Sequence, residues 1–310
     1  MTHNNPIQKP VLVLGGPTAS GKSGLAVSLA STLSGVVINA DSMQIYQGLP
    51  LLTAQPSAED CLRVPHRLYA ALPPDDACSA ARWRDLTIGE IEKAHAEDKL
   101  PIIVGGTGFY LKTLLNGISP VPDVPHEVRD KISALQKEMG NPEFHRAFSL
   151  RDPVMALRLD PFNTQRLVRA WEVLEATGKS LAEWQALPPI GPPEHLRFLT
   201  ILLLPPRITL YAACNARFGH MLEAGALEEV RQFKEKFPTG TALNKALGYP
   251  ELSAYLDGKL SLPEAISDAQ KSTRHYAKRQ VTWFRHQIAA DLMLDAPLPE
   301  SLLAWVKKRL

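Results

Sequence analysis

The chain has 310 residues, of which 45% are hydrophobic and 21% charged, and its formal net charge is +2. Such values are typical of a globular protein with one large or two modest domains, and the small net charge does not by itself indicate a nucleic-acid partner. No apolar run approaches the roughly 20 residues that a membrane span needs, so no membrane association is expected. Three scattered cysteines and the lack of a signal-peptide pattern favour a cytoplasmic protein.

A polar tail is expected over residues 1–10, and the first predicted strand, residues 11–14, leads into the most informative segment. Residues 15–23 read Gly-Gly-Pro-Thr-Ala-Ser-Gly-Lys-Ser and match G-x-x-x-x-G-K-[ST]. Such a loop turns its N–H groups into an anion nest at a helix N-terminus, where the lysine contacts phosphate oxygens and the serine ligates Mg²⁺. We predict that the phosphate compound is bound by Gly16, Pro17, Thr18, Ala19, Ser20, Gly21, Lys22 and Ser23, with Ser23 as the metal ligand. The alternative is a glycine-rich turn with a chance lysine.

The second predicted strand, residues 36–39, is followed by Asp41. Ligand sites in parallel sheets collect at the carboxyl ends of strands, so Asp41 is expected to face the same cleft as the phosphate loop. Three roles compete for this side chain: Mg²⁺ ligand, general base, or N-cap of the next segment.

The third predicted strand, residues 101–104, ends in Gly105-Gly106-Thr107-Gly108. These glycines permit close approach of a ligand to the backbone, and Thr107 offers a hydroxyl within the turn; an ordinary structural turn explains the glycines equally well. The strand lacks the terminal acid of a standard ATPase, which leaves Asp41 as the candidate for that role.

Strands alternating with helices, including a helix near residues 84–97, predict a parallel sheet, and residues 198–204 could supply another strand. Proline clusters bound a region with helical patterns near residues 126–139, 142–149 and 161–176, the last opened by Asp160-Pro161. We expect an α/β fold, a P-loop NTPase-like parallel sheet flanked by helices. Its predicted catalytic core comprises residues 1–118 and 198–310, and residues 119–197 form a mostly helical insertion domain.

Two segments are locally basic. On a helix over residues 271–286, one face carries Lys271, Arg274, Lys278 and Arg285, and another carries Tyr276 and Trp283. The second cluster contains Arg158, Arg166 and Arg169. Either segment could be an ordinary solvated helix face, but together they suggest a polyanion larger than a nucleotide. A lone arginine, Arg217, is expected on the surface unless the site uses it.

Taken together, these segments resemble the tRNA dimethylallyltransferases in their compact bacterial form. The matching stretches are GPTASGKS at 16–23, NADSMQIY at 39–46, GGTGFYLKTLL at 105–115, LDPFNTQRLVRAWEV at 159–173, ALGYPEL at 246–252 and RHYAKRQVTWFR at 274–285. They follow the family's order along nearly the whole chain.

The resemblance implies that the loop grips the diphosphate of dimethylallyl diphosphate. The acceptor would be the exocyclic N6 amine of the adenine on the 3′ side of the anticodon (position 37) in tRNAs that read codons starting with U. Asp41 would be the general base, and Thr107 would bond the oxygen that bridges the prenyl carbon and the diphosphate. Arg217 and Lys22, together with Mg²⁺ at Ser23, would stabilise the leaving diphosphate.

The resemblance also implies contacts with the tRNA anticodon stem-loop by a monomer. The implied contact residues are Asp41, Ser42, Met43, Gln44, Thr107, Arg129, Gln165, Arg166, Leu167, Val168, Arg169, Arg274, Lys278 and Arg279. This chain departs from the family pattern at Gln47, Gln55, Arg67 and Thr164, which concerns tRNA positioning rather than the chemistry. The competing interpretations are a small-molecule or nucleotide kinase that uses ATP, and a non-catalytic RNA-binding protein.

Overall fold

The computed structural model describes residues 8–238, 240–297 and 299–310, and the chain forms two compact units. The first comprises Met1–Leu115 with Pro193–Leu310, as far as they are described, and the second is Asn116–Pro192. The polar tail predicted at residues 1–10 falls largely outside the described residues, and Lys9 and Pro10 already belong to the first strand.

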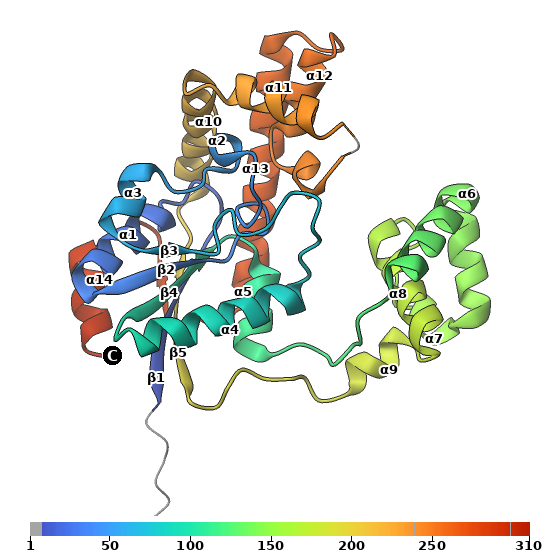
Figure 1. Ribbon diagram of the computed structural model, residues 1–310, viewed down its shortest axis with the longest axis horizontal. Helices are drawn as coiled ribbons and strands as arrows, with labels where there is room; N and C mark the ends of the chain where they lie inside the picture. The colour runs from blue at the N-terminus through green and yellow to red at the C-terminus, as the bar shows by residue number, and fades with distance from the viewer. Residues whose placement is uncertain (1–7, 239, 298) are drawn as a thin grey trace, which may run out of the picture. The chain divides into compact units, whose positions relative to one another are not determined.

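The first unit is built on a six-stranded parallel sheet with the strand order β3-β2-β4-β1-β5-β6 (Figure 1). Its strands are β1 (Lys9–Gly15), β2 (Gly35–Asn39), β3 (His66–Arg67), β4 (Leu100–Gly105), β5 (Leu196–Leu203) and β6 (Leu292–Leu294). The four strands predicted from apolar runs are confirmed as β1, β2, β4 and β5. The edge strands β3 and β6 were not predicted, because such short segments carry no readable pattern.

The central strand β1 pairs in parallel with β4 on one side and with β5 on the other. Val11, Leu12 and Val13 are fully buried, as expected of a strand that has helices over both faces. The pairing places Gly15 beside Gly105, so the loops that follow β1 and β4 leave the sheet at the same edge.

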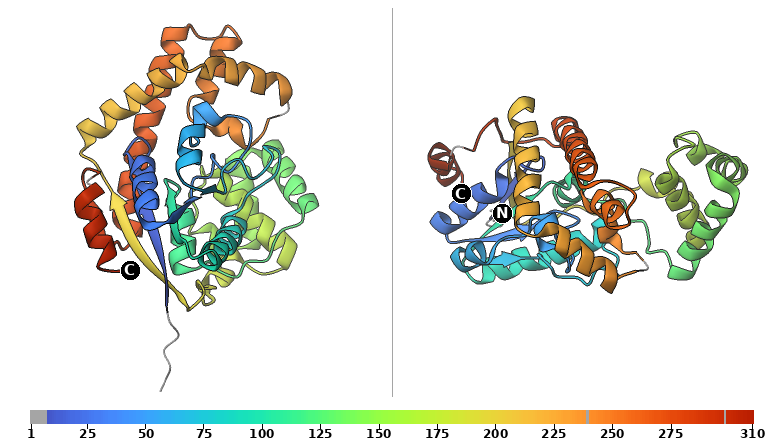
Figure 2. Two further views of the ribbon diagram at one scale, coloured as in Figure 1. Left: turned by 60° about the vertical axis from the view of Figure 1, so that its left-hand side comes forward. Right: turned by 90° about the horizontal axis from the view of Figure 1, so that it is seen from above.

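Helices cover both faces of the sheet (Figures 1 and 2). One face packs against α1 and α14, through residues such as Leu29 and Val306. The other packs against α4, α5 and α13, through residues such as Trp83, Leu111 and Phe284. The helices of this unit are α1 (Lys22–Leu33), α2 (Pro50–Thr53), α3 (Ala58–Arg63), α4 (Ala80–Ala96), α5 (Gly108–Asn116), α10 (Arg207–Glu223), α11 (Ala226–Lys236), the 3₁₀ helix η1 (Ala242–Lys245), α12 (Tyr249–Leu256), α13 (Leu262–Gln287) and α14 (Pro299–Lys307).

The second unit is helical and has its own core. Its helices are α6 (His126–Arg151), α7 (Pro153–Ala156), α8 (Thr164–Thr177) and α9 (Leu181–Ala186). Phe144, Phe148 and Trp171 meet in that core, with ring centroids 4.5 and 5.7 Å from the tryptophan. Gly140, at φ 71°, breaks α6 where the sequence indicated two helical segments.

The predicted start of the third helix in this region is wrong. Helix α8 begins at Thr164 rather than at Pro161, because the Asn163 side chain accepts from the N–H of Arg166 and caps the helix there. Asp160 instead accepts from the N–H of Phe162, which closes a short turn before the helix.

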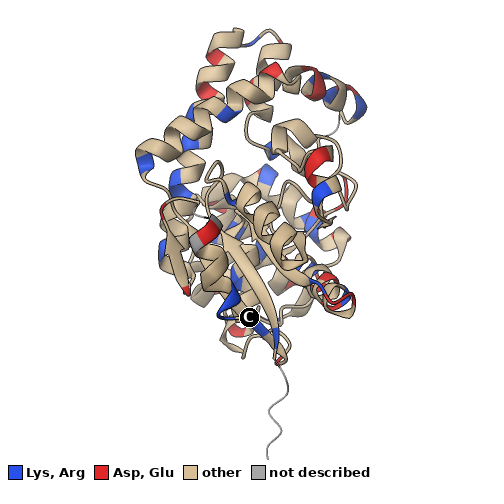
Figure 3. Ribbon diagram, turned by 90° about the vertical axis from the view of Figure 1, so that its left-hand side faces the viewer, with Lys and Arg blue, Asp and Glu red and all other residues tan. Residues whose placement is uncertain are grey.

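None of the helices in the described part of the chain is long and apolar enough to cross a membrane. Figure 3 shows lysine and arginine intermingled with aspartate and glutamate along the ribbon, in keeping with the net charge of +2.

Candidate active site

The phosphate loop joins β1 to α1 at the carboxyl edge of the sheet. Ala19 and Gly21 adopt left-handed conformations, with φ of 60° and 89°, which is the alternation that turns successive N–H groups toward an anion. The Ser20 hydroxyl is buried, with 5% of the residue exposed, and has no hydrogen-bond partner among the described residues. An unpartnered buried hydroxyl is costly, so it fits a loop that bonds a ligand oxygen.

Two cations lie at this loop. Lys22 Nζ donates to the Pro17 carbonyl at 3.1 Å, and Arg217 Nη1, from α10, donates to the Thr18 hydroxyl at 3.1 Å. Burial, together with the charge of Arg217, lowers the pKa of Lys22 to about 8 although Asp41 acts in the opposite direction. Burial likewise lowers the pKa of Arg217. Arg217 therefore contacts the phosphate loop and is only partly exposed, and its role on the leaving diphosphate stays a prediction.

Asp41 lies just after the end of β2. Its Oδ1 accepts from the N–H of Met43 at 2.9 Å, which closes a turn over the next residues rather than capping a helix. The other oxygen has no hydrogen-bond donor among the described residues. The charge of Asp41 also raises the pKa values of both Lys22 and Arg217.

Asn39 holds the Asp41 backbone, a role that the sequence analysis did not assign. Its Oδ1 accepts from the N–H of Asp41 at 2.8 Å, and its Nδ2 donates to the carbonyls of Asp41 and Leu68, both at 3.0 Å. The Trp83 indole donates to the Asn39 carbonyl at 2.9 Å. Asn39 is fully buried. The sequence pattern that could have indicated its role is a polar residue at the end of an otherwise apolar strand.

Thr107 lies on the turn after β4 and faces the residue that follows Asp41. Its hydroxyl accepts from the N–H of Ser42 at 2.9 Å and lies 3.2 Å from the Ser42 hydroxyl. The N–H of Thr107 donates to the carbonyl of Ala40 at 3.2 Å. The segments after β2 and β4 are therefore bonded to each other directly, as their common edge predicted.

Helix α13 closes another side of the site. Tyr276, Arg279, Gln280 and Trp283 line a pocket together with the turn that contains Thr107. Burial and the charge of Asp41 raise the pKa of Tyr276. The aromatic face predicted for this helix therefore packs against the turn after β4.

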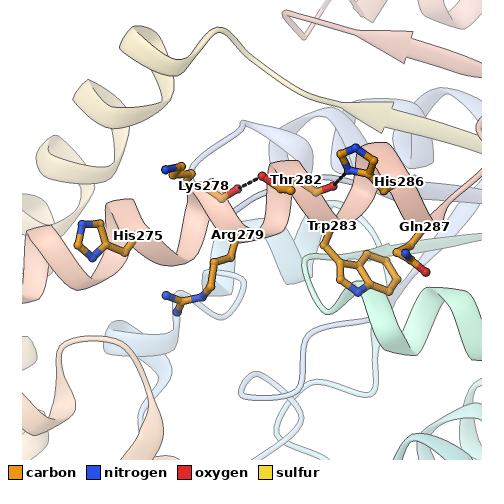
Figure 4. A pocket seen from close by; sticks show the side chains of 7 residues that line it. All are labelled: His275, Lys278, Arg279, Thr282, Trp283, His286 and Gln287. Atoms are coloured by element: carbon orange, nitrogen blue, oxygen red, sulfur yellow. Dashed lines mark hydrogen bonds between the residues drawn. The ribbon is translucent and has the colours of Figure 1, made fainter. Parts of the chain in front are cut away.

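A second, more open pocket lies along the same helix, and Figure 4 shows that Arg279 and Trp283 project from one side of α13 and Lys278 from the other. Lys271, Lys278 and Arg285 of the predicted basic face are exposed. Arg274 donates to Asn215 Oδ1 of α10 at 2.7 Å, which attaches it to a neighbouring helix.

The remaining predicted tRNA contacts differ in exposure. Gln165 and Arg166 are exposed on α8, and Arg169 is partly exposed and ion-paired with Glu172 at 3.5 Å. Leu167 is fully buried in the core of the second unit, with Val168 packed against that core. The Leu167 side chain therefore cannot contact tRNA, because it lies on the face of α8 that is buried in this core.

Three further residues predicted to contact tRNA, Met43, Gln44 and Arg129, differ in how far their side chains are engaged within the protein. Met43 packs against the core of the first unit, and the Gln44 amide nitrogen already donates to the carbonyls of Thr53 and Ala54, at 2.9 and 2.8 Å. Arg129, on α6, is partly exposed, and its Nε is buried without a hydrogen-bond partner among the described residues.

The residues around the loop fit a weakly protein-bound Mg²⁺ rather than a dedicated metal site. Over residues 8–238, 240–297 and 299–310, no group of three or more His, Cys, Asp or Glu side chains could hold a metal. The Ser23 hydroxyl is exposed at the start of α1. Because Mg²⁺ keeps several waters and commonly takes phosphate oxygens, one hydroxyl beside a bound diphosphate suits it.

This fold and site define a parallel α/β protein with a glycine-rich loop between β1 and α1, and with a carboxylate and a threonine hydroxyl at the same edge of the sheet. Residues 44–287 match the family model described as IPP transferase. The tRNA dimethylallyltransferase of Rhodospirillum centenum is 54% identical to this chain, and the alignment covers 94% of this chain and 93% of the relative. The tRNA dimethylallyltransferase of Paramagnetospirillum magneticum is 52% identical, over 96% of this chain and 94% of the relative.

Two solved structures are similar. The tRNA isopentenylpyrophosphate transferase of Bacillus halodurans is 30% identical, with a TM-score of 0.70 and 97% of each chain covered. A eukaryotic dimethylallyltransferase acting on tRNA is 26% identical, with a TM-score of 0.76 over 97% of this chain and 78% of that one. The chain belongs to the tRNA dimethylallyltransferase family and is a transferase with a P-loop NTPase-like fold.

The hydrogen bonds of Asn39 generate a first prediction. Asn39→Leu leaves the backbone groups of Asp41 and Leu68 without their buried partner, so the free energy of unfolding should fall by about 3 kcal/mol in chemical denaturation. The control is Thr200→Val, a buried β5 position whose backbone N–H, not its side chain, bonds Asp291. Equal unfolding free energies for wild type and Asn39→Leu would contradict the role of Asn39.

The lowered pKa of Lys22 leads to a second prediction. Its folded-state pKa of about 8 lies below the ordinary 10.5, so the ammonium is protonated below pH 8 and loses its charge above it. Affinity for inorganic diphosphate, measured by calorimetry, should fall as pH rises through this range. Because diphosphate also titrates, the comparison is with Lys22→Arg, which stays charged. The prediction would be contradicted if the affinities of wild type and Lys22→Arg for diphosphate changed in the same way with pH.

Proposed function

We propose that this protein transfers a dimethylallyl group from dimethylallyl diphosphate to tRNA. The acceptor is the N6 amine of the adenine on the 3′ side of the anticodon (position 37), in tRNAs that read codons starting with U. Family membership over nearly the whole chain supports prenyl transfer to tRNA. The observation that carries the site assignment is that Lys22, Arg217, Asp41 and Thr107 gather at one edge of the sheet.

In this reaction the allylic C–O bond breaks and an N–C bond forms. The electron pair of the broken bond leaves with the diphosphate, where Lys22, Arg217 and the loop N–H groups stabilise the developing charge. The Ser23 hydroxyl would hold a Mg²⁺ ion beside the diphosphate, and that ion would supply further neutralisation of its charge.

The acceptor amine is a poor nucleophile because its lone pair is delocalised into the adenine ring. Asp41 accepts the proton that the amine loses. Its second carboxylate oxygen, which accepts no hydrogen bond from the described residues, is available for this. The Thr107 hydroxyl turns from Ser42 toward the bridging oxygen of the donor. Until the donor binds, its bonds to Ser42 hold it against the residue that follows Asp41.

The target adenine lies in an anticodon loop and is extruded to reach this site. We assign the loop and stem contacts to Ser42, Met43, Gln44 and the α13 residues Arg274, Lys278 and Arg279 in the first unit, and to Arg129, Gln165, Arg166, Val168 and Arg169 in the second. The protein acts on one tRNA as a cytoplasmic monomer, and its three free cysteines suit that compartment.

The test of the reaction is incubation of unmodified tRNA with dimethylallyl diphosphate or with ATP, followed by mass spectrometry of the nucleosides. We expect prenylated adenosine with the first donor only. Prenyl-independent ATP turnover without a modified tRNA would overturn the proposal in favour of a kinase.

The base assignment predicts that Asp41→Asn lowers kcat by about 100- to 10,000-fold, because the amide cannot accept the amine proton. Affinity for tRNA, measured by filter binding, should stay close to that of wild type. Asp75→Asn, an exposed position, is the matched control. An unchanged kcat for Asp41→Asn would assign the proton to another acceptor.

The exposed charge of Lys278 predicts a phosphate contact. Lys278→Ala should weaken tRNA binding and reduce the slope of log K against log salt concentration by about 1. The control is Lys93→Ala, because Lys93 is a lysine of α4 that is ion-paired with Glu90 at 2.7 Å. A salt slope identical to that of wild type would return this face of α13 to an ordinary solvated surface.

A further inference from the structure

The side chain of Gln280 is a buried polar group that the mechanism above does not use. It lies in the C-terminal third of α13 with 6% of the residue exposed. Its Oε1 accepts from the N–H of Thr18 in the phosphate loop at 2.8 Å. Its Nε2 donates to the carbonyl of Gly106 in the turn after β4 at 2.7 Å.

We propose that Gln280 is a positioning residue that sets the distance between the leaving-group half and the acceptor half of the active site. It bonds the backbone of the phosphate loop on one side and the backbone of the Thr107 turn on the other. The inference rests on the proposed prenyl transfer and adds a residue that holds the two halves in register.

The orientation of the Gln280 amide is determined by its partners. The backbone N–H of Thr18 can only donate and the Gly106 carbonyl can only accept, so Oε1 must face Thr18 and Nε2 must face Gly106. A side chain with one acceptor and one donor on the same planar group satisfies both. Removing it would leave two buried backbone groups without partners.

Close packing shows that α13 is held against the turn rather than merely near it. A Cβ on Gly106 would lie 2.5 Å from Gln280 Nε2, and one on Gly108 would lie 2.1 Å from Trp283 Cε3. Both distances are shorter than any ordinary carbon contact, so these glycines allow the helix to reach the backbone of the turn. Gly106 and Gly108 thus serve contact with α13.

The two bonds of Gln280 lie in a longer connection across the site. Thr18 is also held through its hydroxyl by Arg217. On the other side, Thr107 is bonded to Ser42, which follows Asp41. The cation that stabilises the leaving diphosphate and the base that accepts the amine proton are therefore joined through Gln280.

The separation of the two halves matters because the reacting carbon lies between the departing oxygen and the attacking nitrogen. A displacement of about 1 Å in such an arrangement can lower the rate by roughly 100-fold while leaving each substrate's binding groups in place. Loss of Gln280 should therefore reduce kcat more than it reduces affinity for either substrate.

The first test is Gln280→Met, which keeps the side-chain volume and removes both hydrogen bonds. We expect kcat for prenyl transfer to fall by about 10- to 100-fold, with the dissociation constants for tRNA and inorganic diphosphate near those of wild type. The matched control is Gln270→Met on the same helix, where the amide donates to the Asn215 carbonyl at 3.3 Å and does not touch the site. An unchanged kcat for Gln280→Met, or equal losses for both variants, would overturn the inference.

The second test, Gln280→Glu, remains decisive even if Gln280→Met does not fold. A protonated carboxyl can accept from Thr18 through its carbonyl oxygen and donate to Gly106 through its hydroxyl, whereas a carboxylate loses the second bond. Burial raises the pKa of such a group into the range accessible to assay. The ratio of kcat for Gln280→Glu to kcat for wild type should therefore rise as the pH falls.

A ratio that does not change with pH would overturn the positioning role, because a residue that only fills space would give that result. The outcomes also separate this inference from the proposed function. If wild-type protein transfers no prenyl group to tRNA, the proposed function fails. If wild type is active and both Gln280 variants match it, only the role of Gln280 fails.

Discussion

The site depends on the parallel pairing of β1 between β4 and β5. Parallel strands end at the same edge of a sheet, so the loop after β1 and the turn after β4 leave side by side, with Gly15 paired to Gly105. Strand β2 pairs with β4 in the same direction and brings Asn39 level with Val104, which delivers Asp41 to that edge. A register shift of one residue in any of these pairs would turn the strand's buried side chains to the opposite face of the sheet.

The charges at this edge of the sheet suit an anionic ligand. Lys22 and Arg217 are two cations whose pKa values are lowered chiefly by burial, and the carboxylate of Asp41 offsets part of that cost. A bound diphosphate brings more negative charge than one carboxylate and supplies acceptors for the loop N–H groups and the Ser20 hydroxyl.

Local patterns were sufficient for much of this molecule. The glycine spacing and the lysine of residues 15–23 indicated the phosphate loop, and four buried apolar runs indicated the strands that carry it. The roles of Asn39 and Gln280 were not predictable from the sequence, because a buried polar residue can be assigned a role only when its hydrogen-bond partners are known. Those partners are 29 positions away for the Leu68 carbonyl and 262 positions away for the N–H of Thr18.

The sequence by itself determined the phosphate loop, the strand and helix alternation, and the family, because each depends on residues close together in the chain or on ordered motifs. Only the tertiary structure decided that Arg217 bonds the Thr18 hydroxyl of the phosphate loop, that Leu167 is core, and that α8 begins at Thr164. These outcomes depend on which helix face meets the rest of the fold and on which side chain reaches a free backbone N–H. Such competition between neighbouring groups is settled by packing in three dimensions, so a one-dimensional pattern does not contain it.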